Sequence, residues 1–193
     1  MTQAAQGRVL SIIVCAAGPA SAISTLVNRA QSHGWTVQVV ATPAALDFFD
    51  VGEIGKLTDS PVRSQYRKPG EPRSRDADAI IVAPATYNTI NKWAHGISDT
   101  YALGILAETT GLSVPIVVLP FVNSALASRA PFQRSVESLR AEGVRILLGP
   151  GGVQPHEPHT GGALTGSYPW HLALDETDRL LKAGGRPGSP PTT

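Results

Sequence analysis

The stretch AIIVAPATYNTINKWAHGISDTYALG, residues 79–104, decides the fold. Its first five residues form an apolar run without polar alternation, which is typical of a strand that is covered on both faces. We expect Pro84 to end this strand. Thr86 or Asn88 then caps a helix, because a side-chain oxygen at that position accepts hydrogen bonds from the free N–H groups of the first turn. The stretch therefore predicts a strand followed at once by a helix.

The predicted helix carries an apolar stripe, and polar residues gather at its start. Residues 86–89 place hydroxyl, phenol and amide groups at the carboxyl end of the strand, where open parallel sheets bind ligands. These four residues form either a ligand site or a well-capped helix with a structural asparagine. Gly96 interrupts the helix, and Asp99 follows in a second polar cluster. The stripe that we expect to be buried consists of Ile90, Trp93, Ala94 and Ile97.

The rest of the chain repeats this alternation of strand and helix. Apolar runs predict further strands at residues 8–16, 35–41, 113–119 and 144–148. Helical spacing predicts helices at residues 22–33, from residue 46 onward, at 130–141 and at 170–181. This rhythm is typical of a parallel sheet with right-handed crossovers. We therefore expect the α/β class, with a Rossmann-like, flavodoxin-like sandwich of three layers.

Composition and charge narrow the functional classes. The 193 residues suit one domain over residues 1–182, and AGGRPGSPPTT at 183–193 predicts a disordered tail. A net charge of +1 offers no attraction for nucleic acid or an anionic membrane, and no apolar run reaches the roughly 18 residues of a membrane span. Cys15 is the single cysteine, which excludes an internal disulfide and a cysteine metal cluster. Because no leader pattern precedes the first strand, we expect a soluble cytoplasmic protein.

A long segment at residues 50–76 lacks apolar periodicity. It is rich in proline and arginine around Tyr66. It is either a solvated loop or a wall on which Tyr66, Arg67 and Lys68 pair with a substrate carboxylate or phosphate.

A second long segment, residues 149–168, is rich in glycine. Since glycine permits hinge dihedrals, we expect a mobile flap over a ligand. The segment contains His156 and His159, but proline interrupts it and no third ligand lies near, so a metal site is not expected.

The turn after the first predicted strand, AGPAS at residues 17–21, has one glycine. It therefore lacks the three-glycine fingerprint of dinucleotide folds, and the chain has no Walker sequence. Small residues at a helix start leave backbone N–H groups open to a single phosphate, and Ser21 adds a hydroxyl. A plain tight turn explains Gly18 equally well.

These motifs together resemble the homo-oligomeric flavin-containing cysteine decarboxylases. This family includes the epidermin-type and thioamitide-type peptidyl-cysteine decarboxylases and phosphopantothenoylcysteine decarboxylase. PATYNT at residues 84–89 is similar to the family's Pro-Ala-Ser-Ala-Asn-Thr, and residues 90–99 continue it as Ile-Asn-Lys-x-Ala-x-Gly-Ile-x-Asp. PFVN at residues 120–123 corresponds to Pro-x-Met-Asn, and TPAA at residues 42–45 with Phe48 resembles a motif that borders flavin. The related prenylated-flavin synthases share the architecture but lack the Asn-Thr pair.

The resemblance, which runs from residue 8 to about residue 148, implies FMN held between the subunits of a trimer or a trimer-based dodecamer. A charged fraction of only 16% agrees with surface hidden in a ligand site or between subunits. In the family, flavin oxidises the thiol side of a C-terminal cysteine in a peptide or small thiol. Carbon dioxide is then lost from the thioaldehyde and an aminoenethiol forms, while the protein positions and desolvates the reactants.

Matched position by position, the resemblance assigns roles to single residues. Asn88 would fix flavin or substrate, and Asn123 would bind the substrate's carboxylate or amide. The resemblance also assigns the binding of FMN, from its phosphate and ribityl chain to the flavin ring. The residues that would bind it are Gly18, Ser21, Thr42, Phe48, Thr86, Tyr87, Asn88, Thr89 and Phe121.

One residue of the family pattern is missing. Family decarboxylases place a histidine base about a dozen residues before the Pro-Ala motif, but no histidine occurs here between His33 and His95. Tyr66 is then the candidate base, provided that Arg67 and Lys68 lower its pKa, since nearby positive charge favours the phenolate. Two alternatives stay open: an FMN-dependent oxidoreductase that acts on another small molecule, and a flavin-binding subunit without catalysis.

Overall fold

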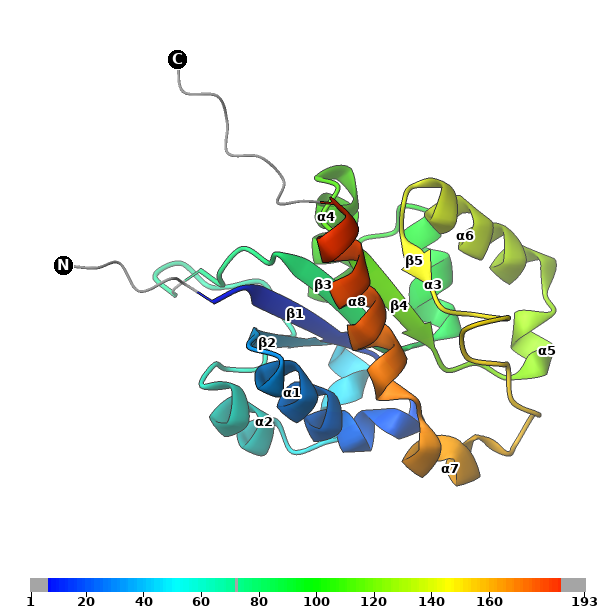
Figure 1. Cartoon of the computed structure of the whole chain (residues 1–193), viewed down its shortest axis with the longest axis horizontal. Helices are drawn as coiled ribbons and strands as arrows, with labels where there is room; N and C mark the ends of the chain where they lie inside the picture. The colour runs from blue at the N-terminus through cyan, green and yellow to red at the C-terminus, as the bar shows by residue number, and fades with distance from the viewer. Residues whose placement is uncertain (1–6, 72, 185–193) are drawn as a thin grey trace, which may run out of the picture.

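Five parallel strands form the centre of the molecule in the computed structural model, which describes residues 7–71 and 73–184 (Figure 1). They lie in the order β2-β1-β3-β4-β5, and each neighbouring pair runs in the same direction. This arrangement confirms the predicted parallel α/β fold. The strands are β1 (Val9–Val14), β2 (Thr36–Ala41), β3 (Ala79–Ala85), β4 (Ile116–Pro120) and β5 (Arg145–Ile146).

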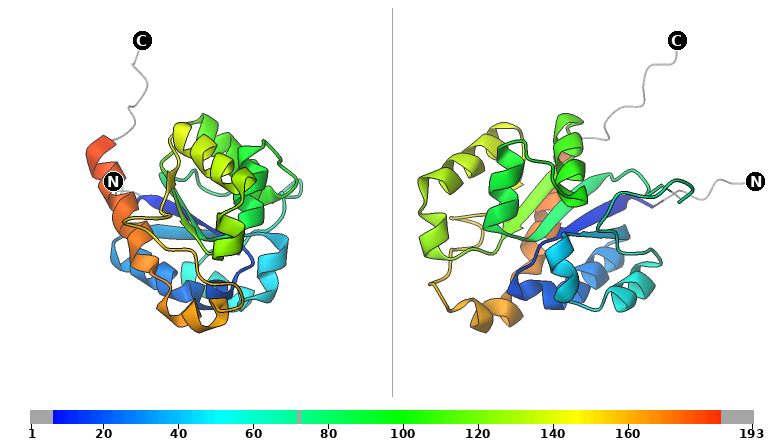
Figure 2. Two further views of the ribbon diagram at one scale, coloured as in Figure 1. Left: turned by 90° about the vertical axis from the view of Figure 1, so that its right-hand side faces the viewer. Right: turned by 180° about the vertical axis from the view of Figure 1, so that it is seen from behind.

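Helices cover both faces of the sheet and complete three layers (Figures 1 and 2). One face packs against α1 (Ile23–Ser32), α2 (Val51–Thr58) and α8 (Trp170–Gly184). The other face packs against α3 (Tyr87–Ala94), α4 (Tyr101–Gly111) and α6 (Ala130–Ala141). Shorter elements in the connections are η1 (Gly18–Ala22), η2 (Pro43–Asp47), α5 (Ser124–Ala127), α7 (Gly161–Leu164) and η3 (Thr165–Ser167).

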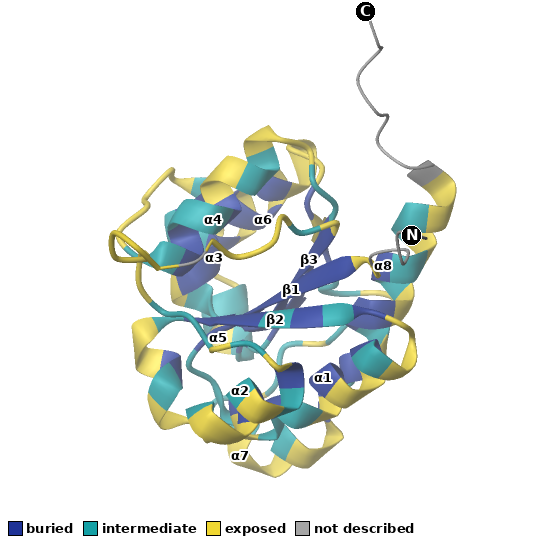
Figure 3. Ribbon diagram, turned by 90° about the vertical axis from the view of Figure 1, so that its left-hand side faces the viewer, coloured by how far each residue is buried: buried dark blue, intermediate teal, exposed yellow. Residues whose placement is uncertain are grey.

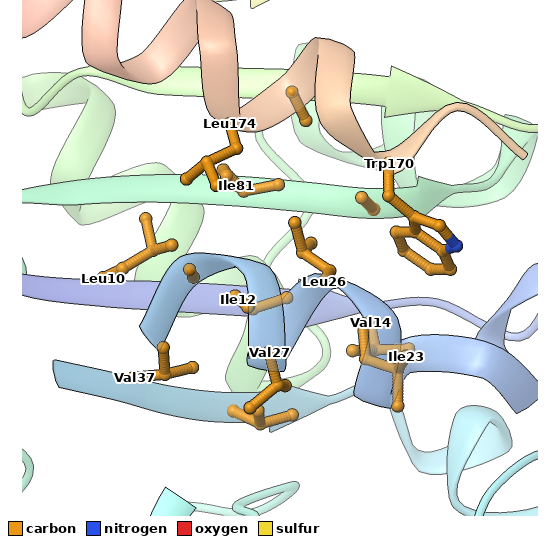
Figure 4. Packing of buried hydrophobic residues seen from close by; sticks show 14 of the residues in the cluster. Leu10, Ile12, Val14, Ile23, Leu26, Val27, Val37, Ile81, Trp170 and Leu174 are labelled. Carbon is orange, nitrogen blue, oxygen red and sulfur yellow. The ribbon is translucent and has the colours of Figure 1, made fainter. Parts of the chain in front are cut away.

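The side chains of β1 alternate between the two halves of the core. Leu10, Ile12 and Val14 belong to the cluster under α1 and α8 (Figure 4). Ile13 and the following Cys15 belong to the cluster under α3, α4 and α6. All of β1 is buried, as Figure 3 shows, because a strand inside a parallel sheet is covered on both faces.

The strand order creates a switch point between β1 and β3. The connection after β1 leads to β2 on one side, and the connection after β3 leads to β4 on the other side. The two turns therefore part at the carboxyl ends of these neighbouring strands. In sheets of this order, that crevice is where ligands bind. We call the carboxyl ends of β1 to β4, with the turns that follow them, the carboxyl edge.

Pro84 lies inside β3 instead of ending it, so that part of the sequence prediction is wrong. The Ala83–Pro84 peptide bond is cis, and the register between β3 and β4 shifts between Val82 and Ala85. The sheet accommodates the proline at this irregularity, where a ladder hydrogen bond is not required. The predicted helix stripe is correct for Ile90 and Trp93, whereas Ile97 lies beyond the end of α3 and is 45% exposed.

Helices also occur where the sequence analysis did not place them. Segment 50–76 begins with α2, which Asp50 caps by accepting a hydrogen bond from Glu53 N at 2.9 Å. The expected helix at residue 46 is the turn η2, and α4 was not predicted at all. Helix α8 continues to Gly184, through the first residues of the predicted tail, and the rest of that tail lies outside the described residues.

Within the described ranges, no helix has the length and apolar character that crossing a membrane requires.

Candidate functional site

The turn after β1 brings the chain to the carboxyl edge at η1. No side chain caps η1, and Ser21 Oγ donates a hydrogen bond to Gly18 O at 3.0 Å. A Cβ at Gly18 would lie 2.8 Å from Thr165 Oγ1 and 3.9 Å from Phe121 Cε1. Gly18 therefore lets η3 and the turn after β4 approach closely, which explains the glycine at this position.

The turn after β3 is held by two threonines. Thr86 Oγ1 accepts a hydrogen bond from Thr89 N at 3.3 Å, and the two hydroxyl oxygens lie 3.1 Å apart. This confirms Thr86 as the N-cap of α3. Thr89 is buried, whereas Asn88 is exposed at the first turn of the helix. The helix start thus combines a fixed hydroxyl pair with an accessible amide.

Cys15 joins the ends of β1 and β3 beneath this turn. Its backbone N donates a hydrogen bond to Pro84 O at 3.1 Å, and the residue is 1% exposed. Burial raises the pKa of the Cys15 thiol, and hydrogen bonds with Thr89 and Thr86 oppose that rise only in part. The thiol is therefore neutral, and it packs the floor of the crevice instead of acting as a nucleophile.

Tyr87 packs against α6. Its ring stacks on Phe132 with centroids 5.3 Å apart, and its hydroxyl accepts a hydrogen bond from Arg129 Nη1 at 3.2 Å. These contacts hold the start of α3 in place. They engage the phenol that the sequence analysis had assigned to the ligand.

The turn after β2 reaches the same edge. Thr42 N donates a hydrogen bond to Val14 O at 2.9 Å, which sets Thr42 beside the end of β1. Phe48 follows η2 and is 39% exposed. An aromatic ring left this open in the turn after β2 is available to a flat ligand.

The turn after β4 supplies Phe121 and Asn123. Phe121 N donates a hydrogen bond to Ala85 O at 2.8 Å, so this turn lies directly beside the end of β3. Asn123 caps α5, because its Oδ1 accepts a hydrogen bond from Leu126 N at 2.9 Å. Within the described part of the chain the Asn123 Nδ2 group has no hydrogen-bond partner, which leaves it as a donor for a ligand.

His156 lies beside these residues, and the sequence analysis considered it only as a metal ligand. It forms an isolated parallel bridge with Asn123, and its ring lies 4.8 Å from that of Phe121. No group of three potential metal-ligating side chains occurs among the described residues, and His159 is exposed with a φ of +67°. A separation of 33 positions from Asn123 gives no periodic signal, so only the fold reveals this proximity.

A cavity of about 370 Å³ opens next to this group, within the range of small-molecule sites. Tyr168 forms one wall, is 6% exposed and donates a hydrogen bond to Leu119 O at 2.5 Å. Burial raises the pKa of Tyr168 well above its ordinary value, and a charge on nearby Cys15 would raise it further. The wall is therefore uncharged at neutral pH. Other residues around the cavity include Phe121, Val122, His156 and His171.

Tyr66 lies in a different cavity, of about 540 Å³. Its side chain is 65% exposed and packs edge-on against Tyr101 at 5.1 Å. Arg67 also lines this cavity, whereas Lys68 lines a second cavity that Tyr66 borders as well. No residue assigned to the flavin lines either cavity. Within one chain, the structure therefore does not join Tyr66 to the carboxyl edge.

Comparison with known proteins identifies a family and several relatives of this chain. The model of the family described as Flavoprotein matches residues 2–167. A probable phosphopantothenoylcysteine decarboxylase from Streptococcus mutans is 26% identical over 129 residues, which cover 63% of this chain and 72% of the relative. The coenzyme A biosynthesis bifunctional protein CoaBC of Escherichia coli K12 is 28% identical over 148 residues, or 72% of this chain. The match spans only 36% of that bifunctional relative.

Solved structures share the fold. The epidermin biosynthesis protein EpiD from Staphylococcus aureus superposes with a TM-score of 0.60 and 25% identity over 72% of this chain and 81% of its own. The FMN-dependent cysteine decarboxylase SpaF superposes with a TM-score of 0.62 and 23% identity, over 90% of this chain and 98% of its own. An EpiD variant in complex with the substrate peptide DSYTC superposes with a TM-score of 0.60 and 22% identity, over 73% of this chain and 80% of its own.

Proposed function

Because the chain belongs to the Flavoprotein family, we propose that it binds FMN and catalyses oxidative decarboxylation of a cysteine at the carboxyl end of a peptide. SpaF is an FMN-dependent cysteine decarboxylase, and EpiD takes a peptide that ends in cysteine. One structural observation carries the proposal: the turns after β1, β2, β3 and β4 all meet at the β1/β3 switch point, where this strand order binds ligands.

The residues at the switch point have the chemistry that FMN binding requires. The backbone of the uncapped turn η1, which Thr165 Oγ1 approaches closely at Gly18, would hold the phosphate and ribityl chain together with the hydroxyls of Ser21 and Thr42. The exposed ring of Phe48 would lie against the isoalloxazine. The threonine pair and the amide of the α3 first turn, Thr86, Asn88 and Thr89, would hold its polar side.

Phe121 and Tyr87 support this arrangement in different ways. Phe121 would border the flavin, since its ring stands between the Gly18 turn and His156. Tyr87 would act through its position in the turn, because its side chain is held by Phe132 and Arg129.

The protein binds and orients the substrate in this proposal, while FMN, when bound, accepts two electrons and a hydrogen from the cysteine β-carbon. Asn88 fixes the reacting end. The free Nδ2 of Asn123 donates a hydrogen bond to the substrate carboxylate, since its Oδ1 is already committed to Leu126 N. The rings of Phe121 and of the uncharged Tyr168 line the neighbouring cavity, where they would shield part of the substrate from water.

The same proposal includes a homo-oligomer, a trimer or an assembly of trimers. Large apolar side chains stay open in the single chain, among them Phe48 at 39% and Ile97 at 45% exposure. A partner subunit over these residues would cover apolar surface and enclose the flavin. Light scattering of the FMN-loaded protein measures the mass directly, and a monomer would contradict this part of the proposal.

Mass spectrometry tests the activity. A peptide that ends in cysteine is expected to lose carbon dioxide and two hydrogens after incubation with the FMN-loaded protein. The same peptide with a terminal serine, or with an amidated cysteine, is expected to keep its carboxyl carbon. If no cysteine-ended peptide changes mass while the flavin stays bound, the decarboxylase function is wrong.

An FMN-dependent oxidoreductase on another small molecule is the second candidate. It is favoured by the position of Tyr66, which leaves the expected base away from the carboxyl edge of its own chain. Bleaching of the flavin by thiol-free reductants, with none by cysteine peptides, would select this candidate.

A further inference from the structure

We propose that His156 is the acid–base residue of this site and that its Nε2 accepts the thiol proton of the substrate cysteine. The inference rests on the function proposed above and adds a residue to it. His156 N donates a hydrogen bond to Val122 O at 3.2 Å, and Ser124 N donates to His156 O at 2.7 Å. Two backbone hydrogen bonds therefore fix His156 directly beside Asn123, the residue that would hold the substrate carboxylate.

The imidazole has a defined tautomer. Its Nδ1 lies 2.9 Å from Glu157 O, and because a carbonyl oxygen only accepts, Nδ1 carries the proton and donates it. In the neutral ring the lone pair is then on Nε2. Within residues 7–71 and 73–184, Nε2 has no hydrogen-bond partner. The nitrogen that a general base needs is thus the free one.

Two neighbours hold the ring in place. It is tilted by 39° against Phe121, with the centroids 4.8 Å apart. A Cβ at Gly161 would lie only 3.0 Å from His156 Cε1, 3.2 Å from its Nε2 and 3.2 Å from Phe121 Cε1. Glycine at the start of α7 therefore permits the close approach that holds the imidazole at the 370 Å³ cavity.

Other titratable groups near the cavity cannot easily take this role. Tyr168 is buried, and its raised pKa keeps it protonated at neutral pH. His171 lines the cavity from α8, but it is exposed, and among the described residues no hydrogen bond holds its ring. Glu157 follows His156 in the chain, and its backbone carbonyl serves the Nδ1 proton. His156 is the group with both a fixed position and a free acceptor.

The proton balance of the reaction assigns two steps to Nε2. As the carbon–sulfur double bond forms, the thiol proton moves to Nε2, and the β-hydrogen leaves with two electrons to FMN. The bond to the carboxyl carbon then breaks, carbon dioxide leaves, and the electron pair moves onto sulfur as an enethiolate. The imidazolium returns its proton to that sulfur, which yields the aminoenethiol and restores the neutral base. The reduced flavin is the other product of a single anaerobic turnover.

Single-turnover kinetics with His156→Gln test the assignment. Flavin bleaching by a cysteine-ended peptide is followed without oxygen between pH 5 and 9. In the wild type we expect the rate to show a limb that rises with pH, because only a neutral imidazole can accept the proton. His156→Gln is expected to slow bleaching by about 10²- to 10⁴-fold, the range for a positioned base, and to abolish this limb.

Two other histidines serve as comparisons. His159→Asn is the matched control, because His159 is three residues away, exposed, and in a left-handed backbone conformation that asparagine tolerates. It is expected to keep the wild-type rate and pH profile. His171→Gln decides which cavity histidine causes the pH dependence, and the rising limb is expected to remain in that variant.

A readout without turnover completes the test. FMN-loaded protein is titrated with a serine-ended peptide, and the histidine side chains are observed by NMR. The signal that His156→Gln removes is expected to shift on peptide addition, and this variant is expected to keep wild-type FMN content. Wild-type kinetics in His156→Gln, or an unshifted His156 signal, would overturn the assignment alone. A wild type that holds no FMN or reacts with no cysteine peptide would overturn the proposed function and the His156 role together.

Discussion

Two segments without apolar periodicity occupy different places in this fold. The arginine-rich segment, residues 61–78, and the glycine-rich segment, residues 149–168, both contain prolines and lack apolar periodicity. The glycine-rich segment is tied to the carboxyl edge by the bridge between Asn123 and His156. The arginine-rich segment pairs with the sheet through Arg63 and Val40 on β2, and most of the rest of it is exposed.

Both segments pair with the sheet, so the strand beside which each one runs, more than its residue types, decides which loop lies near the candidate site. Tyr66 and Arg67 have the side chains that a substrate pocket needs, yet they line a cavity over the face of the sheet. His156 stands at the carboxyl edge because its segment continues beside β4. The chemistry of a residue therefore has to be judged together with the strand end that its backbone reaches.

The largest expected effect is a loss of stability that differs between a tyrosine of the glycine-rich segment and a tyrosine of the arginine-rich segment. Tyr168→Phe removes the buried hydroxyl that donates to Leu119 O and leaves this carbonyl without its partner. We expect the free energy of unfolding to fall by about 1–3 kcal/mol. Tyr66→Phe alters a side chain that is 65% exposed, and we expect a change within about 0.5 kcal/mol. Urea denaturation measures both, and equal losses would contradict the difference in anchoring.

The stability of the protein at alkaline pH depends on two buried groups, Cys15 and Tyr168. Burial raises the pKa of Cys15 and of Tyr168, so the folded chain keeps both protons to a higher pH than the unfolded chain does. Their contribution is complete below the unfolded values, about 8.5 for the thiol and about 10 for the phenol, and it is lost as pH rises above them. Stability is expected to fall by up to about 1.4 kcal/mol per pH unit for each group.

Single substitutions show which of the two groups causes the fall of stability with pH. Cys15→Ala is expected to remove the part that begins near pH 8.5, and Tyr168→Phe the part that begins near pH 10. Urea titrations at a series of pH values supply the measurement. A slope that survives in the double variant would show that other groups cause it.

A pair of helix caps gives the next effect. Thr86 and Thr100 each accept a hydrogen bond from the backbone three residues on, at 3.3 Å in both cases. Replacement of either by alanine is expected to cost about 1 kcal/mol of stability. FMN affinity, measured by flavin fluorescence, is expected to fall about tenfold in Thr86→Ala and to stay unchanged in Thr100→Ala. Equal affinities would place the flavin away from the start of α3.

The smallest effect concerns Gly161. A Cβ there comes within 3.2 Å of His156 Nε2, so Gly161→Ala is expected to displace the imidazole by a few tenths of an ångström. We expect a few-fold slower decarboxylation, scored as carbon dioxide loss by mass spectrometry, with FMN content unchanged. Gly162→Ala is the control, because a Cβ at Gly162 meets nothing within 4 Å. The same loss in both variants would speak against a role for this contact.

The sequence predicted the sheet and most of its helices because their signals are local. The apolar run of β3, the cap at Thr86 and the stripe of α6 each depend on neighbours within a few residues. Helix α4 was missed because its own apolar residues are spread around the helix and do not form a stripe on one face. The position of Pro84 was wrong because an irregular register between β3 and β4 tolerates it.

The candidate site was predicted only where a motif marks a strand end. Thr86, Asn88 and Asn123 follow strands directly, so parallel topology brings them to one edge. His156 reaches that edge through a loop whose path depends on long-range backbone pairing, and no short pattern encodes it. Tyr66 was chosen for its charged neighbours, and the fold of its own chain sets it elsewhere.

A crystal structure of the protein grown with FMN tests the central claim most directly. We expect the phosphate at the Gly18–Ser21 turn, the isoalloxazine between Phe48 and the start of α3, and His156 beside the open face of the site. Flavin density in the arginine-lined cavity near Tyr66, or none at the β1/β3 switch point, would contradict it.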